Sequence, residues 1–397
     1  MSNVITVGCD LHDRSMLLKT AVGKKKPEQR SFLNDSENRQ KMVNYLWEFA
    51  RRHQVNRIVF VYEASGQGFG LYDLLRDRQI ECYVLSPTHL PKTPKSKRNK
   101  TDARDAQMLF EQARGFVLAG NDLPVVWTPP QRLRDDRELV RARLEAGEAT
   151  TQVKLKIFSL LKRYNQPLPP FFVKSRNWTK RWVSWLREQA EQMATTVAPV
   201  MLALVTRFET LRDEITDLDR HIRKLAKTNR YKTAYEKLTK LTGVGILTAM
   251  TFLTEIGDAL RFSNRRQIAA YLGVIPSANE SGDADDRKGH ITRQGPSRVR
   301  KVLCQAAWTA IRCDAKVHED WLRIKGKGKK RGKKATVAIM RRLAIRMWHM
   351  MFECGTPEEL VGSGRPGMGH VTLTRAPQKE PPLSSSPSLQ PQEACAG

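Results

Sequence analysis

The sequence predicts an α/β domain at the N-terminus, followed by a mostly helical chain. Two short apolar runs, 3–10 and 58–62, have the length of buried strands, and a helical pattern lies between them. Strands that alternate with helices are typical of an α/β layer fold. From about Arg132 onward, long charged segments with helical periodicity replace the strands, which indicates a second, helical part.

The N-terminal elements follow from the spacing of apolar residues and from the polar residues between them. The expected strands cover residues 3–10, 15–22, 58–62 and 81–85. Asp35 can cap a helix between the second and third strands. The apolar residues of that helix share one face and are Met42, Tyr45, Leu46 and Phe49. A second helix is expected over 71–78, and a basic loop, 92–100, then leads into a helix that begins near Asp102.

The helical middle of the chain contains a heptad repeat. Its a positions hold Met201, Phe208, Ile215 and Ile222, and its d positions hold Leu204, Leu211, Leu218 and Leu225. This spacing is typical of a coiled-coil seam, and isoleucine at a with leucine at d favours a parallel dimer. The alternative is a helical hairpin that packs the seam within one chain. Upstream, 154–164 is expected to be a basic amphipathic helix that can lie along nucleic acid.

The C-terminal part begins with a glycine turn between two expected helices. The segment 238–245 resembles a helix-hairpin-helix, in which glycines turn tightly and point amides at a phosphate. A polar loop, 276–295, follows, and Pro296 suits the first turn of the next helix. The buried side of that helix is expected to hold Val299, Val302, Leu303, Ala306 and Ala310. The Gly-spaced basic run 325–334 is expected to be too flexible for regular structure and suited to phosphate contact.

The charge balance indicates a polyanionic partner. Lys and Arg total 69 against 41 Asp and Glu, which gives a formal net charge of +28 over 397 residues. Nucleic acid is the first choice, because no apolar run approaches the length of a membrane-spanning helix. No signal peptide is expected, and the six cysteines show neither CxxC spacing nor paired histidines. A reducing cytoplasm is the simplest setting for such a chain.

Four acidic residues form the candidate chemical centre. Asp10 and Glu63 end two apolar strands, while Asp102 and Asp105 share one face at the start of a helix. Carboxylates that converge repel one another unless a cation lies between them, and Mg²⁺ prefers oxygen ligands. In so basic a chain, this pattern predicts two-metal chemistry on a phosphodiester. Asp105 can alternatively serve as a negative charge facing the helix macrodipole.

Several short motifs occur in a specific order along the chain. They include GCDLH, VYEASG, KTDARDAQ, LTKLTGVGILTAMTFLTEIGDALRF and GHITRQGPSRVRKVLCQAAW. This series, spread over most of residues 4–350, resembles the transposases of IS110-class insertion sequences, which are relatives of the pilin-gene invertases. The resemblance implies a RuvC-like N-terminal domain with a DEDD tetrad and a C-terminal transposase domain with a serine nucleophile. It also implies a bridge RNA that pairs with donor and target DNA.

Carried over residue by residue, the resemblance places the tetrad on Asp10, Glu63, Asp102 and Asp105 and the serine nucleophile on Ser281. The implied parts are a catalytic RuvC/RNase H-like domain at 1–128, a helical coiled-coil region at 129–232, a transposase domain at 233–356 and a disordered tail at 357–397. The implied protein is a bacterial, cytoplasmic, nucleoid-associated recombinase that uses Mg²⁺ and a bridge RNA. It is expected to be a homodimer through the coiled coil and a tetramer in the synaptic complex.

Several of these assignments have alternatives. Ser277 is the main rival of Ser281, and a serine in a polar loop is usually only a turn former. A junction-resolving endonuclease would use the tetrad alone to activate water, and a basic binding protein would carry a degenerate tetrad. Trp308 is expected in the core rather than stacked on a base. His12 and His290 lie near the site in sequence, but a lone histidine is weak support for a catalytic role.

Overall fold

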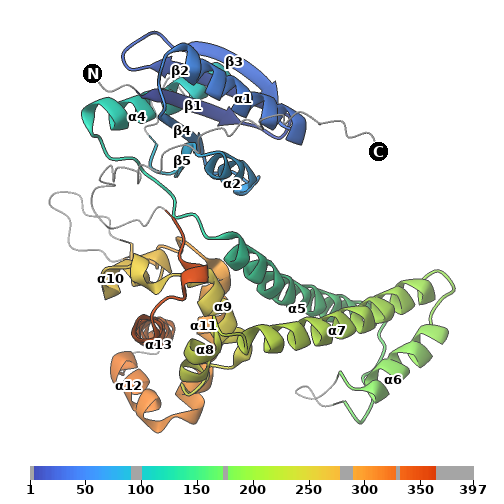
Figure 1. Cartoon of the computed structure of the whole chain (residues 1–397). Coiled ribbons are helices and arrows are strands. Elements are labelled where there is room, and N and C mark those ends of the chain that lie inside the picture. Colours follow the sequence, from blue (N-terminus) through green and yellow to red (C-terminus); the bar gives the residue numbers. More distant parts are fainter. Residues whose placement is uncertain (1–3, 91–100, 173–177, 278–288, 328–330, 364–397) are drawn as a thin grey trace, which may run out of the picture.

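The computed structural model describes residues 4–90, 101–172, 178–277, 289–327 and 331–363. Figure 1 shows a sheet domain, a long helical arm and a helical body. The sheet has five strands in the order β3-β2-β1-β4-β5. They are β1 (Ile5–Leu11), β2 (Ser15–Val22), β3 (Glu28–Leu33), β4 (Ile58–Glu63) and β5 (Glu81–Leu85). The mixed α/β N-terminus and the helical remainder confirm the predicted fold class, an α/β domain followed by a mostly helical chain.

The sheet is covered by helices on both faces. Strand β1 lies in the middle, antiparallel to β2 and parallel to β4. One face packs against α1 (Ser36–Arg52) and α2 (Gly70–Asp77), where Val7 and Cys9 join a core with Leu46 and Leu75. The other face packs against α4 (Asp102–Ala119). Asp35 caps α1 as predicted, since its side chain accepts from the amide of Asn38.

The arm consists of α5 (Gln131–Arg163), α6 (Lys180–Glu191) and α7 (Ala198–Ala226), with α5 and α7 side by side (Figure 1). Both ends of the heptad seam are buried within the single chain. Met201 and Phe208 pack with Ile157, while Ile222 packs in the core that contains Val140. These two ends of the seam therefore pack within one chain, as the hairpin alternative predicts. Between them the seam residues are only half-buried, and a dimeric coiled coil stays a prediction.

The helical body has one large apolar core. Its elements are α8 (Lys232–Leu238), α9 (Ile246–Ile256), η1 (Ala259–Arg261), α10 (Arg265–Tyr271), α11 (Ser297–Cys313), α12 (Ala315–Lys325), α13 (Gly332–Cys354) and η3 (Glu358–Leu360). The five residues predicted for the buried side of α11 are all buried, which confirms that prediction. Gly243, at φ +87°, sits against α11, and a Cβ there would lie 2.3 Å from the Ala306 carbonyl oxygen. The turn between α8 and α9 therefore needs a glycine for close helix packing.

Three expectations about the C-terminal part were wrong. Lys333 and Lys334 belong to the first turn of α13, because this end of the basic run continues into a helix with buried Ala335. Trp308 is 43% exposed, with Trp321 of α12 as its ring neighbour at 6.2 Å. The start of the predicted disordered tail is ordered, since Leu360 is buried and Ser363 pairs with Thr128. The rest of the tail, 364–397, lies outside the described residues.

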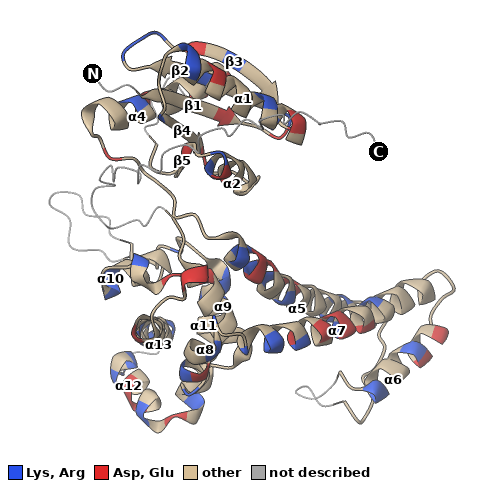
Figure 2. Cartoon of the chain, viewed as in Figure 1, with Lys and Arg blue, Asp and Glu red and all other residues tan. Residues whose placement is uncertain are grey.

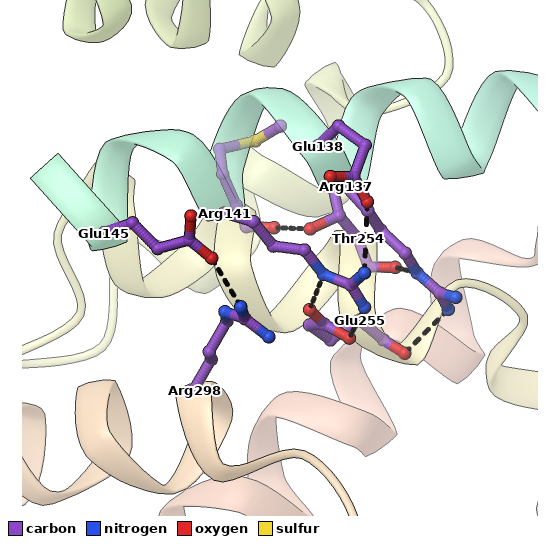
Figure 3. Close-up of polar contacts among 8 residues, drawn as sticks. Arg137, Glu138, Arg141, Glu145, Thr254, Glu255 and Arg298 are labelled. Carbon is purple, nitrogen blue, oxygen red and sulfur yellow. Dashed lines mark hydrogen bonds and ion pairs between the residues drawn. The ribbon is translucent and has the colours of Figure 1, made fainter. Parts of the chain in front are cut away.

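Charged contacts fix the base of the arm to the body (Figure 3). Arg141 on α5 donates to both carboxylate oxygens of Glu255 on α9, at 2.8 and 3.1 Å. Arg137 donates to the carbonyls of Thr254 and Glu255, so it satisfies acceptors at the C-terminal end of α9. Arg298 on α11 donates to Glu145 at 2.6 Å. These contacts hold α5, α9 and α11 as one unit.

The sheet domain is tied to the arm and body through α2. Arg134 on α5 donates to both oxygens of Asp73 at 2.7 Å, and the Tyr72 hydroxyl lies in hydrogen-bond contact with Ser363. Within the described part of the chain, no helix has both the length and the apolar character needed to cross a membrane.

Candidate metal centre

Two adjacent parallel strands carry the first pair of acidic residues. In the pairing of β1 with β4, Cys9 lies opposite Tyr62, so Asp10 and Glu63 follow as neighbours. Side chains alternate along a strand, which puts Asp10 on the face of Gly8 and Glu63 on the face of Val61. Because Val61 packs with Leu109 and Ala113 of α4, both carboxylates leave the sheet on the face that α4 covers.

Gly8 lets α4 approach the sheet closely. A Cβ at Gly8 would lie 2.2 Å from the backbone nitrogen of Phe110 and 2.7 Å from the carbonyl oxygen of Ala106. No side chain fits at such distances without displacing the helix backbone. The sequence signal of this contact is the GCD triplet, in which a glycine interrupts an apolar strand two residues before Asp10.

The first turn of α4 carries the second acidic pair. The buried stripe of the helix includes Ala106, Leu109 and Ala113, and Asp102 and Asp105 extend this stripe toward the N-terminus at helical spacing. Both carboxylates therefore face the end of the sheet from which Asp10 emerges. Negative charge is also favourable at this end of a helix, where the macrodipole is positive.

His12 lies between the two acidic segments. Its Nε2 is 3.1 Å from Oδ2 of Asp10 and 3.5 Å from Oδ1 of Asp102. The turn that carries it is fixed by Asn34, whose side-chain amide donates to the His12 carbonyl at 2.7 Å and to Gln67. Asp10, His12 and Asp102 place ligand atoms within 4.8 Å of one another. The sequence places His12 near the site without giving it a role, although its spacing of two residues from Asp10 puts both side chains on one face of an extended chain.

The electrostatics of the cluster centre on Asp10. Its side chain is 14% exposed, and burial raises the pKa of its carboxyl above the usual value. The charge and hydrogen bond of His12 act in the opposite direction, and the negative charges of Asp105 and Asp102 raise the pKa further. Asp10 is thus a desolvated carboxylate among other carboxylates, an arrangement that a bound cation stabilises.

The residues present fit a hard divalent cation. Asp10, Asp102 and Asp105 offer carboxylate oxygens from two elements that Gly8 holds together, and Glu63 ends the neighbouring strand. Oxygen ligands with one or two carboxylates and open positions suit Mg²⁺. Carboxylate ligands also suit Mn²⁺. The cluster is therefore a candidate metal centre, and the four predicted residues are brought to one end of the sheet.

The predicted nucleophile Ser281 and the basic loop 92–100 lie outside the described residues. Ser277, the rival of Ser281 as nucleophile, is described. The Ser277 hydroxyl donates to the carbonyl of His290 at 3.0 Å. The Ser277 amide donates to the same carbonyl at 2.8 Å. Through these two bonds Ser277 holds together the two flanks of the segment 278–288.

Two family models match the chain. One, a transposase model of the DEDD IS110 type, covers residues 7–166 and includes the sheet domain with its acidic cluster. The other, described as the transposase IS116/IS110/IS902 family, covers residues 235–322 of the helical body. The first match also includes α5, while α6 and α7 of the arm lie between the two matches. The first match contains Asp10, Glu63, Asp102 and Asp105, and the second contains Ser281.

Individual relatives agree with these matches. The y4qE protein of Sinorhizobium fredii, named provisionally as a transposase, is 35% identical over 64% of this chain, which spans only 58% of that relative. The transposase of insertion sequence element IS1111A from Coxiella burnetii is 24% identical over 74% of this chain and 79% of its own length. A pilin gene-inverting protein of Moraxella bovis is 23% identical, over 75% and 81% respectively.

Proposed function

The chain belongs to the IS110/IS116/IS902 family of transposases, and on that premise we propose that it is an RNA-guided DNA recombinase. It cuts and rejoins DNA strands through a covalent serine–DNA intermediate. The observation that carries the proposal is the convergence of Asp10, Asp102 and Asp105 at one end of the sheet in a chain of net charge +28. Phosphodiester chemistry is the use that best accounts for both features.

In this proposal the sheet domain is the catalytic domain and is RuvC-like and RNase H-like. Its support is the order β3-β2-β1-β4-β5, with a central strand that carries one acidic residue and a helix across the sheet that carries two more. Asp10, Glu63, Asp102 and Asp105 are the proposed ligands of two Mg²⁺ ions. When bound, such ions polarise phosphoryl oxygens and stabilise developing charge on the reacting oxygens.

Ser281 supplies the nucleophile in the proposed reaction. Its hydroxyl oxygen forms a bond to the phosphorus, the bond from phosphorus to one sugar oxygen breaks, and the proton ends on that leaving oxygen. Rejoining reverses these steps with a new DNA hydroxyl. A serine hydroxyl is a weak nucleophile by itself, so the step depends on carboxylates that hold a cation next to it. The Asp10 cluster and Ser281 must therefore meet, within one chain or between two.

Sequence recognition falls to a bridge RNA in this proposal. The described residues contain no zinc finger or homeodomain, and Figure 2 shows Lys and Arg on helices of the sheet domain, the arm and the body. Such a surface reads backbone rather than base edges. The half-buried middle of the α7 seam, at Leu211, Ile215 and Leu218, is the proposed contact between subunits. Recombination of two DNA molecules then proceeds in a higher assembly of this dimer.

The serine step is tested by trapping protein on DNA. Wild-type protein, incubated with Mg²⁺, its guide RNA and end-labelled substrate DNA, is expected to give a labelled band at protein mass after denaturation. Ser281→Ala is expected to abolish the band, because no hydroxyl remains to bond the phosphorus. Ser277→Ala is the matched control, in the same loop region, and is expected to retain it.

Two outcomes contradict the proposal. An adduct that persists in Ser281→Ala removes this residue from the reaction. Cleaved DNA without any adduct in the wild-type protein supports instead a metal-dependent, junction-resolving endonuclease that uses water, for which the Asp10 cluster alone suffices.

A further inference from the structure

We propose that a basic groove of the helical body holds the backbone of the DNA strand that is to be cut. The groove lies between α10, residues 289–293 and α13, has a volume of about 940 Å³, and is called the α10–α13 groove below. The inference rests on the proposed function, because the strand it binds is the substrate of that reaction. It adds a site and its ligand chemistry, a single-stranded phosphodiester.

The walls of the α10–α13 groove are strongly basic. They carry Arg265, Arg266, Arg293, Lys333, Lys334, Arg341 and Arg342, and the described lining residues include no Asp or Glu. Arg342 is paired with Asp320 at 2.9 Å. Among the described residues, none forms a salt bridge with the other six. Figure 2 shows basic positions on both α10 and α13. Cations that have no acidic partner in the described part of the chain favour an anion with repeated charges.

The lining of the groove also contains apolar residues. They are Val274, Pro276, Ile291, Val337, Ala338 and Ile345. A single strand exposes its sugars and bases as well as its phosphates, so it can contact apolar and basic lining residues together. A duplex keeps its bases inside and offers these apolar residues fewer contacts. The composition of the groove therefore favours one strand over two.

The segment 289–295, which brings Arg293 to the groove, is held against the end of α10. Gly295, at φ +68°, passes so close that a Cβ there would overlap the Tyr271 carbonyl oxygen, at 1.8 Å. Arg300 on α11 donates to the carbonyls of Gln294 at 2.6 Å and Gly295 at 3.1 Å. The backbone that presents Arg293 is thereby fixed before any ligand arrives, and preorganisation of this kind lowers the entropy lost on binding.

The groove adjoins both points at which the chain enters and leaves the serine segment. That segment, 278–288, lies outside the described residues, but its two flanks are tied together. The Gly289 amide donates to the Ser277 carbonyl at 3.0 Å, and Pro276 and Gly289 line the groove. A strand in the groove therefore passes beside these flanks. This position favours the DNA strand that the serine attacks over the guide RNA.

Binding of a short single-stranded oligodeoxynucleotide tests the inference, measured by fluorescence anisotropy over a range of salt concentrations. The variant Arg266→Ala/Lys334→Ala removes one exposed cation from each wall. Each phosphate contact contributes a slope of about 0.7 in log affinity against log salt, so loss of two flattens the slope by about 1.4. The same relation predicts roughly 25-fold weaker binding at about 0.1 M salt. Arg51→Ala/Arg52→Ala, exposed on α1, is the matched control and is expected to keep the wild-type slope.

Three results overturn the inference: a wild-type slope in the groove variant, an equal loss in the α1 control, or a loss confined to RNA of the same sequence. Arg265→Gln/Lys333→Gln serves as a second groove pair if thermal melting shows that the first is unfolded. The measurement is made in EDTA on a Ser281→Ala background. Failure of the serine reaction therefore leaves the binding result intact, and the two proposals fail separately.

Discussion

Asp10→Asn is expected to lower the rate of DNA strand cleavage by about a thousandfold or more, because a metal centre contributes several kcal/mol and each 1.4 kcal/mol is a factor of ten. The Asp10 side chain is 14% exposed, against 58% for Asp102, and His12 and Asp102 are its neighbours. Asparagine keeps the size of the side chain and removes the charge that a divalent cation needs. The rate is measured on labelled DNA with guide RNA and Mg²⁺ in excess.

The control for this prediction lies in the same domain. Asp35 caps α1 and is exposed, and asparagine is an equally good helix cap. Asp35→Asn is therefore expected to cleave at the wild-type rate with an unchanged melting temperature. Wild-type cleavage by Asp10→Asn would remove the acidic cluster from the reaction.

Gly8→Ala is expected to disrupt the cluster without touching any acidic residue. The new Cβ meets the backbone of Phe110 at 2.2 Å, and backbone atoms cannot move aside as a flexible side chain can. The helix α4 must shift, and Asp102 and Asp105 shift with it. Overpacking of this severity costs about 3 kcal/mol or more, which corresponds to a melting temperature lower by roughly 6–12 °C.

Gly66→Ala is the matched control for the steric argument. Gly66 also lies in the sheet domain, and a Cβ there would have no heavy atom within 4 Å. We expect its melting temperature to change by no more than about 2 °C, since surface substitutions are usually within about 0.5 kcal/mol. If Gly8→Ala melts like Gly66→Ala and cleaves normally, the close approach of α4 to β1 does not position the cluster.

Apolar periodicity was enough to locate most of the sheet domain. Strands β1, β2, β4 and β5 and helix α1 lie where the sequence predicts them, because each has a continuous or one-sided apolar pattern. Strand β3 was missed. It is an edge strand with almost entirely exposed residues, so burial imposes no pattern on it. The seam of α7 shows the opposite problem, since one heptad pattern serves a hairpin or a dimer equally well.

The candidate site also contains residues that could be predicted from the sequence and residues that could not. Asp10, Glu63, Asp102 and Asp105 could be predicted because each stands at the end of a patterned element. The proximity of His12 to Asp10 follows from their spacing of two residues, but its contact with Asp102 could not be predicted, because that contact depends on how α4 approaches the sheet. The α10–α13 groove also escaped prediction. Its walls come from segments about 70 residues apart, and the end of the basic run proved to be helical. Ser281 rests on the family resemblance and stays a prediction.

The measurement that tests the central claim most directly is a titration of the protein with Mn²⁺, followed by electron paramagnetic resonance. The account predicts saturable binding in the wild-type protein and in Asp35→Asn, and its loss in Asp10→Asn and Asp102→Asn. Binding is also expected to weaken as the pH falls, because burial raises the pKa of Asp10 and protonation removes a ligand. Equal Mn²⁺ binding by the wild-type protein and both cluster variants would contradict the account.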